Sequence, residues 1–95
     1  MIECELTIQN RLGLHARPAS LFVQATNKYK SRIKVIKDNL EVDGKSIMGL
    51  LMLAAPMGTV LKIIVEGEDE KQMVEHLTKL FTSRFGEDSD YQVNA

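Results

Sequence analysis

Residues 11–19 read Arg11-Leu12-Gly13-Leu14-His15-Ala16-Arg17-Pro18-Ala19, and they mark the passage from an extended segment through a loop into a helix. Gly13 allows the loop to bend sharply. Pro18 falls in the first turn of the helix, where its missing N–H costs no hydrogen bond. The stretch therefore predicts a helix that begins at Ala16, with His15 at the junction of loop and helix.

On either side of this stretch, apolar residues recur at the spacing typical of a strand or of a helix. Strands are expected over 2–8, 31–37, 40–42 and 60–66, with Asp38-Asn39 as a hairpin turn. Helices are expected over 16–29, over 47–54 and from Asp69 to about Gly86. The order β-α-β-β-α-β-α, with one apolar face on each element, predicts a two-layer α/β sandwich. Its antiparallel sheet would carry the helices on one side.

Composition restricts the class of protein. The chain has 95 residues and a net charge of −1, which predicts one domain and disfavours nucleic acid and anionic membrane surfaces as partners. The first residues do not resemble a signal peptide, and no apolar run is long enough to span a bilayer. A single cysteine fits a reducing compartment, so a cytoplasmic protein without membrane insertion is expected.

His15 is placed where a phosphate would be favoured. The first N–H groups of a helix have no internal partner and the helix dipole adds positive charge, so a helix start can bind an anion. Gly13 and Ala16 would form the backbone cradle, and Arg17 can add directed donors to phosphate oxygens. A neutral imidazole can attack phosphorus directly, which predicts His15 as a phosphoryl acceptor with Arg17 stabilising the phosphate.

Other roles for these residues stay open on residue types alone. His15 could equally be a surface histidine at a helix start, with Arg17 merely solvated. A hydrolase with His15 as base is less well supported, because no Ser or Asp partner stands at suitable spacing. His76 is the only other histidine and Cys4 the only cysteine, so no metal site and no cofactor are expected.

The motif Leu14-His15-Ala16-Arg17-Pro18-Ala19 resembles the active-site signature of the HPr phosphocarriers of the bacterial phosphoenolpyruvate-dependent phosphotransferase system. A second segment, Gly44-Lys45-Ser46-Ile47-Met48-Gly49-Leu50, resembles the same family. The resemblance implies an HPr-like domain over 1–86 and an open-faced sandwich with sheet order 1-4-2-3 and three helices on one face. Residues 87–95 are polar, so we expect a solvated C-terminal tail that begins with the carboxylate of Glu87.

The same resemblance implies a function. Nδ1 of His15 would accept a phosphoryl group from phospho-enzyme I and pass it to an enzyme IIA domain. The protein would then be a stoichiometric carrier with a phosphohistidine intermediate and no independent turnover, rather than an enzyme. From its size and the transient docking of its partners, we expect a monomer.

Ser46 has two interpretations. The sequence supports it directly as the N-cap of the second helix. The resemblance implies a regulatory phosphosite for HPr kinase/phosphorylase, at which a phosphate would add roughly −2 charge beside an apolar face. Both interpretations can hold at once.

The short helix after Ser46 is apolar nearly all round, although it can bury only one face. The resemblance implies that Ile47, Met48, Leu51 and Met52 face outward and dock enzyme I and IIA domains, a role that suits adaptable methionines. The alternative is a core helix, which we expect for Leu50 and Leu53.

Two branches of the family compete. The segments 11–14, 50–53 and 80–88 resemble NPr of the nitrogen-related chain, whereas 44–49 resembles the kinase-regulated HPr forms. The final destination of the phosphoryl group therefore stays open. The alternative function is a regulatory interaction module, acting through the nitrogen branch or through Ser46, in which sugar transport plays no part.

Overall fold

The computed structural model describes residues 1–87 and contains the strands and helices in the predicted order. The elements are β1 (Ile2–Thr7), α1 (Ala16–Thr26), β2 (Arg32–Lys37), β3 (Leu40–Asp43), α2 (Ile47–Met52), β4 (Val60–Glu66), α3 (Glu70–Thr82) and the 3₁₀ turn η1 (Arg84–Gly86). Residues 88–95, most of the predicted polar tail, lie outside the described residues.

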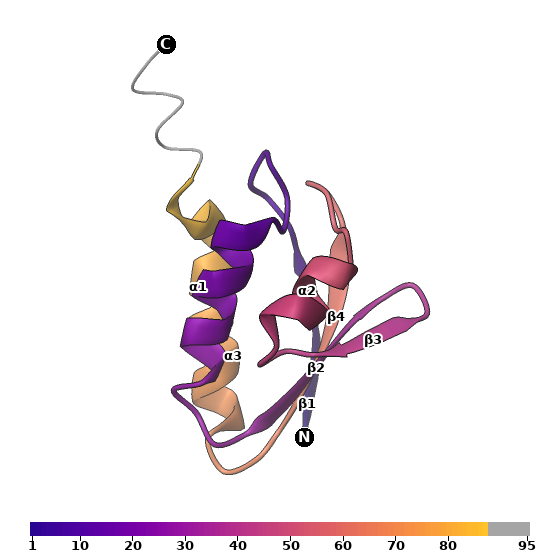
Figure 1. Ribbon diagram of the computed structural model, residues 1–95. Coiled ribbons are helices and arrows are strands. Elements are labelled where there is room, and N and C mark those ends of the chain that lie inside the picture. Colours follow the sequence, from indigo (N-terminus) through magenta and orange to yellow (C-terminus); the bar gives the residue numbers. More distant parts are fainter. Residues whose placement is uncertain (88–95) are drawn as a thin grey trace.

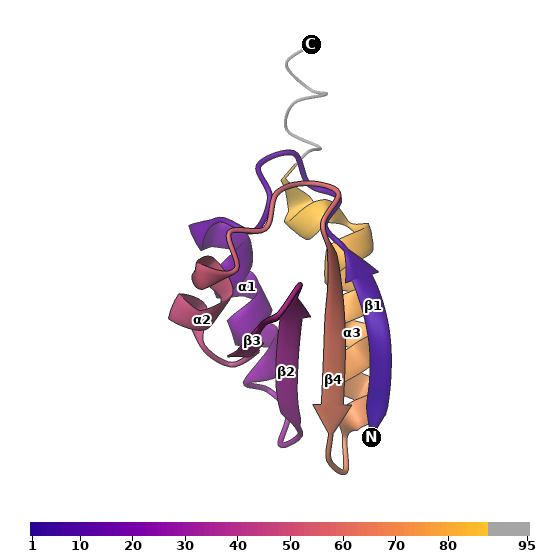
Figure 2. The same cartoon turned by 90° about the vertical axis from the view of Figure 1, so that its right-hand side faces the viewer.

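The four strands form one sheet in the order β1-β4-β2-β3, and every neighbouring pair is antiparallel. Ile63 of β4, one of the two inner strands, lies opposite Cys4 on one side and Val35 on the other. The three α-helices cover one face of this sheet and leave the other face open (Figures 1 and 2). The predicted open-faced sandwich and its strand order are confirmed.

The core lies between the sheet and the helices. The rings of Phe22 in α1 and Phe81 in α3 meet edge to face with centroids 6.0 Å apart. Alternate residues of the strands face these rings because successive side chains point to opposite sides of a sheet. The largest side chains of this core with almost no exposure are Phe22, Phe81, Ile8, Leu50, Leu61, Ile63, Met73 and Leu77.

Each helix is shorter than the sequence predicts. The helix α1 ends at Thr26 rather than Tyr29, and α2 ends at Met52 because Ala54 adopts a left-handed conformation with φ of 47°. The third helix stops at Thr82, and Arg84 and Phe85 then take φ values of 57° and 53°.

This left-handed turn changes the course of the chain. Phe85 is buried against Phe81, with ring centroids 5.1 Å apart. The turn η1 therefore ends near the loop between β1 and α1, and both lie at the end of the molecule opposite the N-terminus (Figures 1 and 2). Among residues 1–87, no helix has the length and apolar character needed to cross a bilayer.

Asp69, just before α3, ties this helix to the end of the loop after α1. Its carboxylate accepts hydrogen bonds from the Ser31 hydroxyl, from the Lys30 amide at 2.8 Å and from the Ser31 amide at 2.9 Å. The Ser31 hydroxyl is the largest cause, and together these donors lower the pKa of Asp69 from 3.8 to about 2. The folded state therefore favours the ionised carboxylate more strongly than the unfolded chain does.

We expect this carboxylate to stabilise the fold above about pH 4 and to lose that effect as the pH falls through about 2. The free energy of unfolding, measured in urea, should differ between the wild type and Asp69→Asn at about pH 4. This difference should shrink as the pH falls to about 2. Glu68→Gln, which removes an exposed neighbouring carboxylate, serves as the control. A difference for Asp69→Asn that stays constant between those pH values would contradict the assignment.

Candidate functional site

His15 is the N-cap residue of α1, as predicted. Its backbone is extended, with φ of −87° and ψ of −168°, and its carbonyl oxygen accepts the first helical hydrogen bond from the Ala19 amide at 3.0 Å. Its side chain makes no capping hydrogen bond. Pro18 has no N–H, so the amides of Ala16 and Arg17 are the first-turn donors without a partner inside the helix. The helix start therefore presents two amides beside the imidazole.

Gly13 fixes the loop that leads into His15. It adopts φ of +74°, and a Cβ at this position would lie 2.6 Å from the carbonyl oxygen of Ala55 and 2.9 Å from Cα of Pro56. The next residue, Leu14, donates its amide to the same Ala55 carbonyl at 2.9 Å. Only glycine allows this close approach of two backbones together with a left-handed conformation, so the loop is held in place by backbone contacts.

The structure brings His15 and Arg17 to one carboxylate. Nε2 of His15 lies 2.8 Å from Oε2 of Glu87, and Nη1 of Arg17 lies 3.5 Å from the same oxygen. Nη1 also donates to the carbonyl oxygen of Phe85 at 3.2 Å. The His15 side chain remains 39% exposed and the Arg17 side chain 59% exposed. The predicted imidazole and guanidinium therefore form one solvent-accessible site, and His15 is not a merely solvated surface histidine.

Glu87 corrects an expectation from the sequence. We expected a polar tail from this residue onward with a solvated carboxylate, but the side chain of Glu87 is only 10% exposed. Its Oε1 accepts a hydrogen bond of 2.8 Å from Nδ2 of Asn10. The reason is the left-handed turn at Arg84 and Phe85, which directs the chain back toward His15.

Asn10 is the second residue of the site that the sequence does not single out. It is fully buried, and its Nδ2 donates to the carbonyl oxygen of Gly13 at 2.7 Å as well as to Glu87. No local pattern indicates the contact with Glu87, because Asn10 and Glu87 are separated by 77 positions in the chain.

Ser46 caps α2, as predicted. Its Oγ accepts the amide hydrogen of Gly49 at 3.0 Å. The hydroxyl belongs to a half-buried residue at the start of a helix of six residues. The capping role of Ser46 is thereby confirmed.

The faces of α2 divide largely as expected. Met48 is 70% exposed, Met52 64% and Ile47 39%. Leu50 and Leu53 are buried, as we expected for a core face. Leu51, predicted to face outward, is instead half-buried against the core. We name the exposed residues Ile47, Met48 and Met52 the α2 apolar face. The helix α2 packs against α1, whose N-cap is His15.

The other histidine and the cysteine lie elsewhere. Nδ1 of His76 lies 2.9 Å from the Tyr29 hydroxyl, and His76 is half-buried. Cys4 packs against the core and burial raises the pKa of its thiol. Within residues 1–87, no three His, Cys, Asp or Glu side chains are grouped to hold a metal ion.

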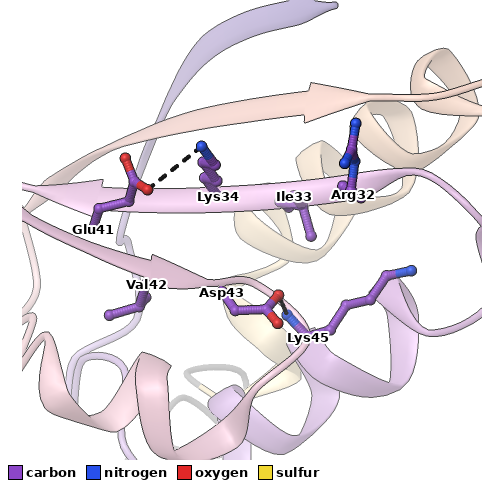
Figure 3. Close-up of a pocket in the computed structure, with 7 residues that line it drawn as sticks. All are labelled: Arg32, Ile33, Lys34, Glu41, Val42, Asp43 and Lys45. Atoms are coloured by element: carbon purple, nitrogen blue, oxygen red, sulfur yellow. Dashed lines mark hydrogen bonds and ion pairs between the residues drawn. The ribbon is translucent and has the colours of Figure 1, made fainter.

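A hollow beside β2 and β3 is lined by three basic side chains (Figure 3). Each of these side chains has a partner. Lys34 pairs with Glu41 at 3.6 Å, and Arg32 pairs with Glu66 at 3.4 Å. Nζ of Lys45 donates to the carbonyl oxygen of Tyr29 at 2.8 Å. These paired cations do not form an anion site comparable to the one at His15.

Comparison with known proteins agrees with the geometry. Residues 2–83 match the family model described as "PTS HPr component phosphorylation site". "Phosphocarrier protein HPr" of Xylella fastidiosa strain Temecula1 is 45% identical over 94% of this chain and 100% of its own length. The "HPr-like protein Crh" of Bacillus subtilis is 43% identical over 81% of this chain and 91% of its own length.

Solved structures give the same result. A crystal structure of HPr from Thermoanaerobacter tengcongensis superposes with a TM-score of 0.88 at 48% identity and covers 93% of this chain and 99% of that one. A structure of an HPr dimer from the same organism gives a TM-score of 0.73 at 48% identity, covering 92% of this chain and 100% of that one. The chain belongs to the HPr family of phosphocarrier proteins of the phosphotransferase system.

Proposed function

We propose that this protein accepts a phosphoryl group from phospho-enzyme I on Nδ1 of His15 and transfers it to an enzyme IIA domain in the cytoplasm. One observation carries the proposal. The exposed imidazole of His15 lies at the start of α1, and it shares the Glu87 carboxylate with the guanidinium of Arg17. An acceptor nitrogen and positive donors are thus present in one accessible place.

The chemistry requires little more than positioning and charge stabilisation. The Nδ1 lone pair forms the new bond to phosphorus, while the bond between phosphorus and the donor's leaving group breaks. The Ala16 and Arg17 amides, the partial positive charge of the helix start and the guanidinium would hold the phosphoryl oxygens. The protein acts as a stoichiometric carrier without turnover of its own, and the step needs no cofactor.

A two-step transfer tests this function. Purified protein incubated with phosphoenolpyruvate and enzyme I should take up one acid-labile phosphate per chain, and a IIA domain added afterwards should remove it. Failure of the wild type to take up phosphate from an enzyme I that phosphorylates an authentic HPr would contradict the proposal.

Docking of both partners is assigned to the α2 apolar face. Met48 and Met52 are highly exposed, although solvent exposure of methionine is unfavourable. They lie on the helix that packs against α1. A phosphate on Ser46 would place roughly −2 charge next to this face, so modification by HPr kinase/phosphorylase would weaken docking. Leu51 is not included, because it is half-buried.

A regulatory interaction module is the second candidate, favoured by the similarity to Crh. Such a module would signal through the nitrogen branch or through Ser46 and Met48, and it would keep partner binding and cellular output without phosphate on His15. Normal output from a His15→Ala strain would favour this candidate over the carrier. We propose that the carrier works as a monomer, which sedimentation of the phosphorylated and unphosphorylated protein would test.

A further inference from the structure

The strongest unassigned feature is the contact of Glu87 and Asn10 with the ring of His15. We propose that Glu87, held by Asn10, is a positioning residue that fixes the tautomer and orientation of the His15 imidazole for phosphoryl acceptance. This inference rests on the proposed function for its rate prediction, but its structural part can be tested without any transfer.

An ionised carboxylate can only accept hydrogen bonds, whereas a neutral imidazole has one N–H donor and one lone pair. Oε2 of Glu87 lies 2.8 Å from Nε2 of His15. The proton of the neutral ring must therefore be on Nε2, which leaves the lone pair on Nδ1. The contact thus selects the tautomer in which Nδ1 is the nucleophile.

The carboxylate is itself fixed by a buried amide. Nδ2 of Asn10 donates both to Oε1 of Glu87 at 2.8 Å and to the Gly13 carbonyl at 2.7 Å. Both of these neighbours are acceptors, so the amide cannot flip without placing its oxygen against another oxygen. Asn10 is fully buried and its Oδ1 has no hydrogen-bond partner. A buried carbonyl without a partner is unfavourable. The side-chain amide of Asn10 keeps this orientation because its Nδ2 donates to both neighbouring acceptors.

Glu87 can also stabilise the charge that develops on the ring. When Nδ1 bonds to phosphorus, the bond to the donor's leaving group breaks and its electron pair goes to that group. The imidazole keeps its Nε2 proton at this stage and gains positive charge. That charge faces Oε2 of Glu87 at the Nε2 edge, while the phosphoryl group occupies the opposite nitrogen. The carboxylate therefore favours the phosphorylated ring without occupying the position of the phosphate.

The guanidinium of Arg17 completes this arrangement. Its Nη1 lies 3.5 Å from Oε2 of Glu87 and 3.2 Å from the carbonyl oxygen of Phe85. These are long, partly exposed contacts, and the side chain is 59% exposed. Arg17 can therefore turn from Glu87 toward a phosphoryl group at low cost, whereas the shorter contact of Glu87 with His15 persists.

The structural test is nitrogen NMR of ring-labelled histidine in the unphosphorylated protein, at about pH 9 where a histidine ring is neutral. The wild type should show His15 almost entirely as the Nε2–H tautomer. Glu87→Gln is the main variant. The glutamine amide has one acceptor oxygen and one donor nitrogen, so it cannot accept hydrogen bonds from Asn10 and from His15 on separate atoms as the carboxylate does. This variant should shift the His15 ring signals toward a mixture of tautomers.

The kinetic test measures phosphoryl acceptance from phospho-enzyme I in the same variants. Glu87→Gln should lower the maximal rate by about tenfold to a hundredfold, the range seen when the carboxylate partner of a metal-bound imidazole is removed. The KM for enzyme I should stay close to the wild-type value, since a positioning residue acts on chemistry rather than docking. Asn10→Ala combined with Glu87→Gln should cost no more rate than Glu87→Gln alone, because both residues act through one contact.

Glu66→Gln is the matched control, since this carboxylate pairs with Arg32 on the open face of the sheet. It should change neither the ring signals nor the rate. Unchanged ring signals and an unchanged maximal rate in Glu87→Gln would overturn the inference, as would a raised KM with the maximal rate intact. If the double variant Asn10→Ala/Glu87→Gln fails to fold, the Glu87→Gln result alone decides. A wild type that takes up no phosphate but shows the single tautomer would reject the proposed function and leave the positioning role standing.

Discussion

His15→Ala is expected to abolish phosphate uptake from phosphoenolpyruvate and enzyme I. The substitution removes the only side-chain nucleophile at the start of α1, and alanine offers no atom that can bond to phosphorus. The loss should be complete rather than partial, because the neighbouring amides and Arg17 stabilise a phosphoryl group but cannot accept one covalently. Uptake of radiolabelled phosphate by the purified variant measures this directly.

The control is the second histidine of the chain. His76→Gln should retain wild-type uptake, because His76 is half-buried on α3 and bonded to the Tyr29 hydroxyl. The His15→Ala protein should stay folded but lose about 1 kcal/mol of stability, because the largely buried carboxylate of Glu87 loses its hydrogen bond to the ring. Residual acid-labile phosphate on folded His15→Ala would show that another residue carries the group.

Met48→Glu is expected to weaken docking of both enzyme I and a IIA domain by about 30-fold, which corresponds to about 2 kcal/mol. Met48 is the most exposed residue of the α2 apolar face, at 70%, and burying a new carboxylate there without a partner is costly. The effect should fall on KM, while the rate at saturating partner stays near the wild-type value. Transfer rates measured over a range of partner concentrations separate the two.

Val60→Glu provides a matched control for this docking variant. Val60 is 50% exposed, so the same type of charge is introduced at a comparably open position. It lies on β4, where the alternation of burial directs it to the sheet face without helices. Equal effects of Met48→Glu and Val60→Glu would argue that added charge, rather than loss of the α2 apolar face, is responsible.

Much of the fold could be predicted from the sequence because its signals are local. The burial of alternate residues in β4 follows the pattern of Leu61, Ile63 and Val65. Ser46 caps α2 through a contact three residues away. Pro18 fixes the first turn of α1, so the position of His15 at the helix start also follows from neighbouring residues.

The rest of the site could not be predicted because it depends on distant contacts. Glu87 reaches His15 across 72 positions, and it does so only after a left-handed turn formed by Arg84 and Phe85. Non-glycine residues adopt that conformation rarely, so no local rule indicates it. Leu51 was misplaced for a related reason, since a helical wheel does not reveal how much of each flank of α2 the sheet covers.

The most direct test of the account is phosphorus and nitrogen NMR of the phosphorylated wild type with ring-labelled histidine. The account predicts a single phosphorus–nitrogen coupling, to Nδ1 of His15, and a proton retained on Nε2 beside Glu87 while the ring is positively charged. A phosphate found on Nε2 of His15, on His76 or on an oxygen atom would contradict it.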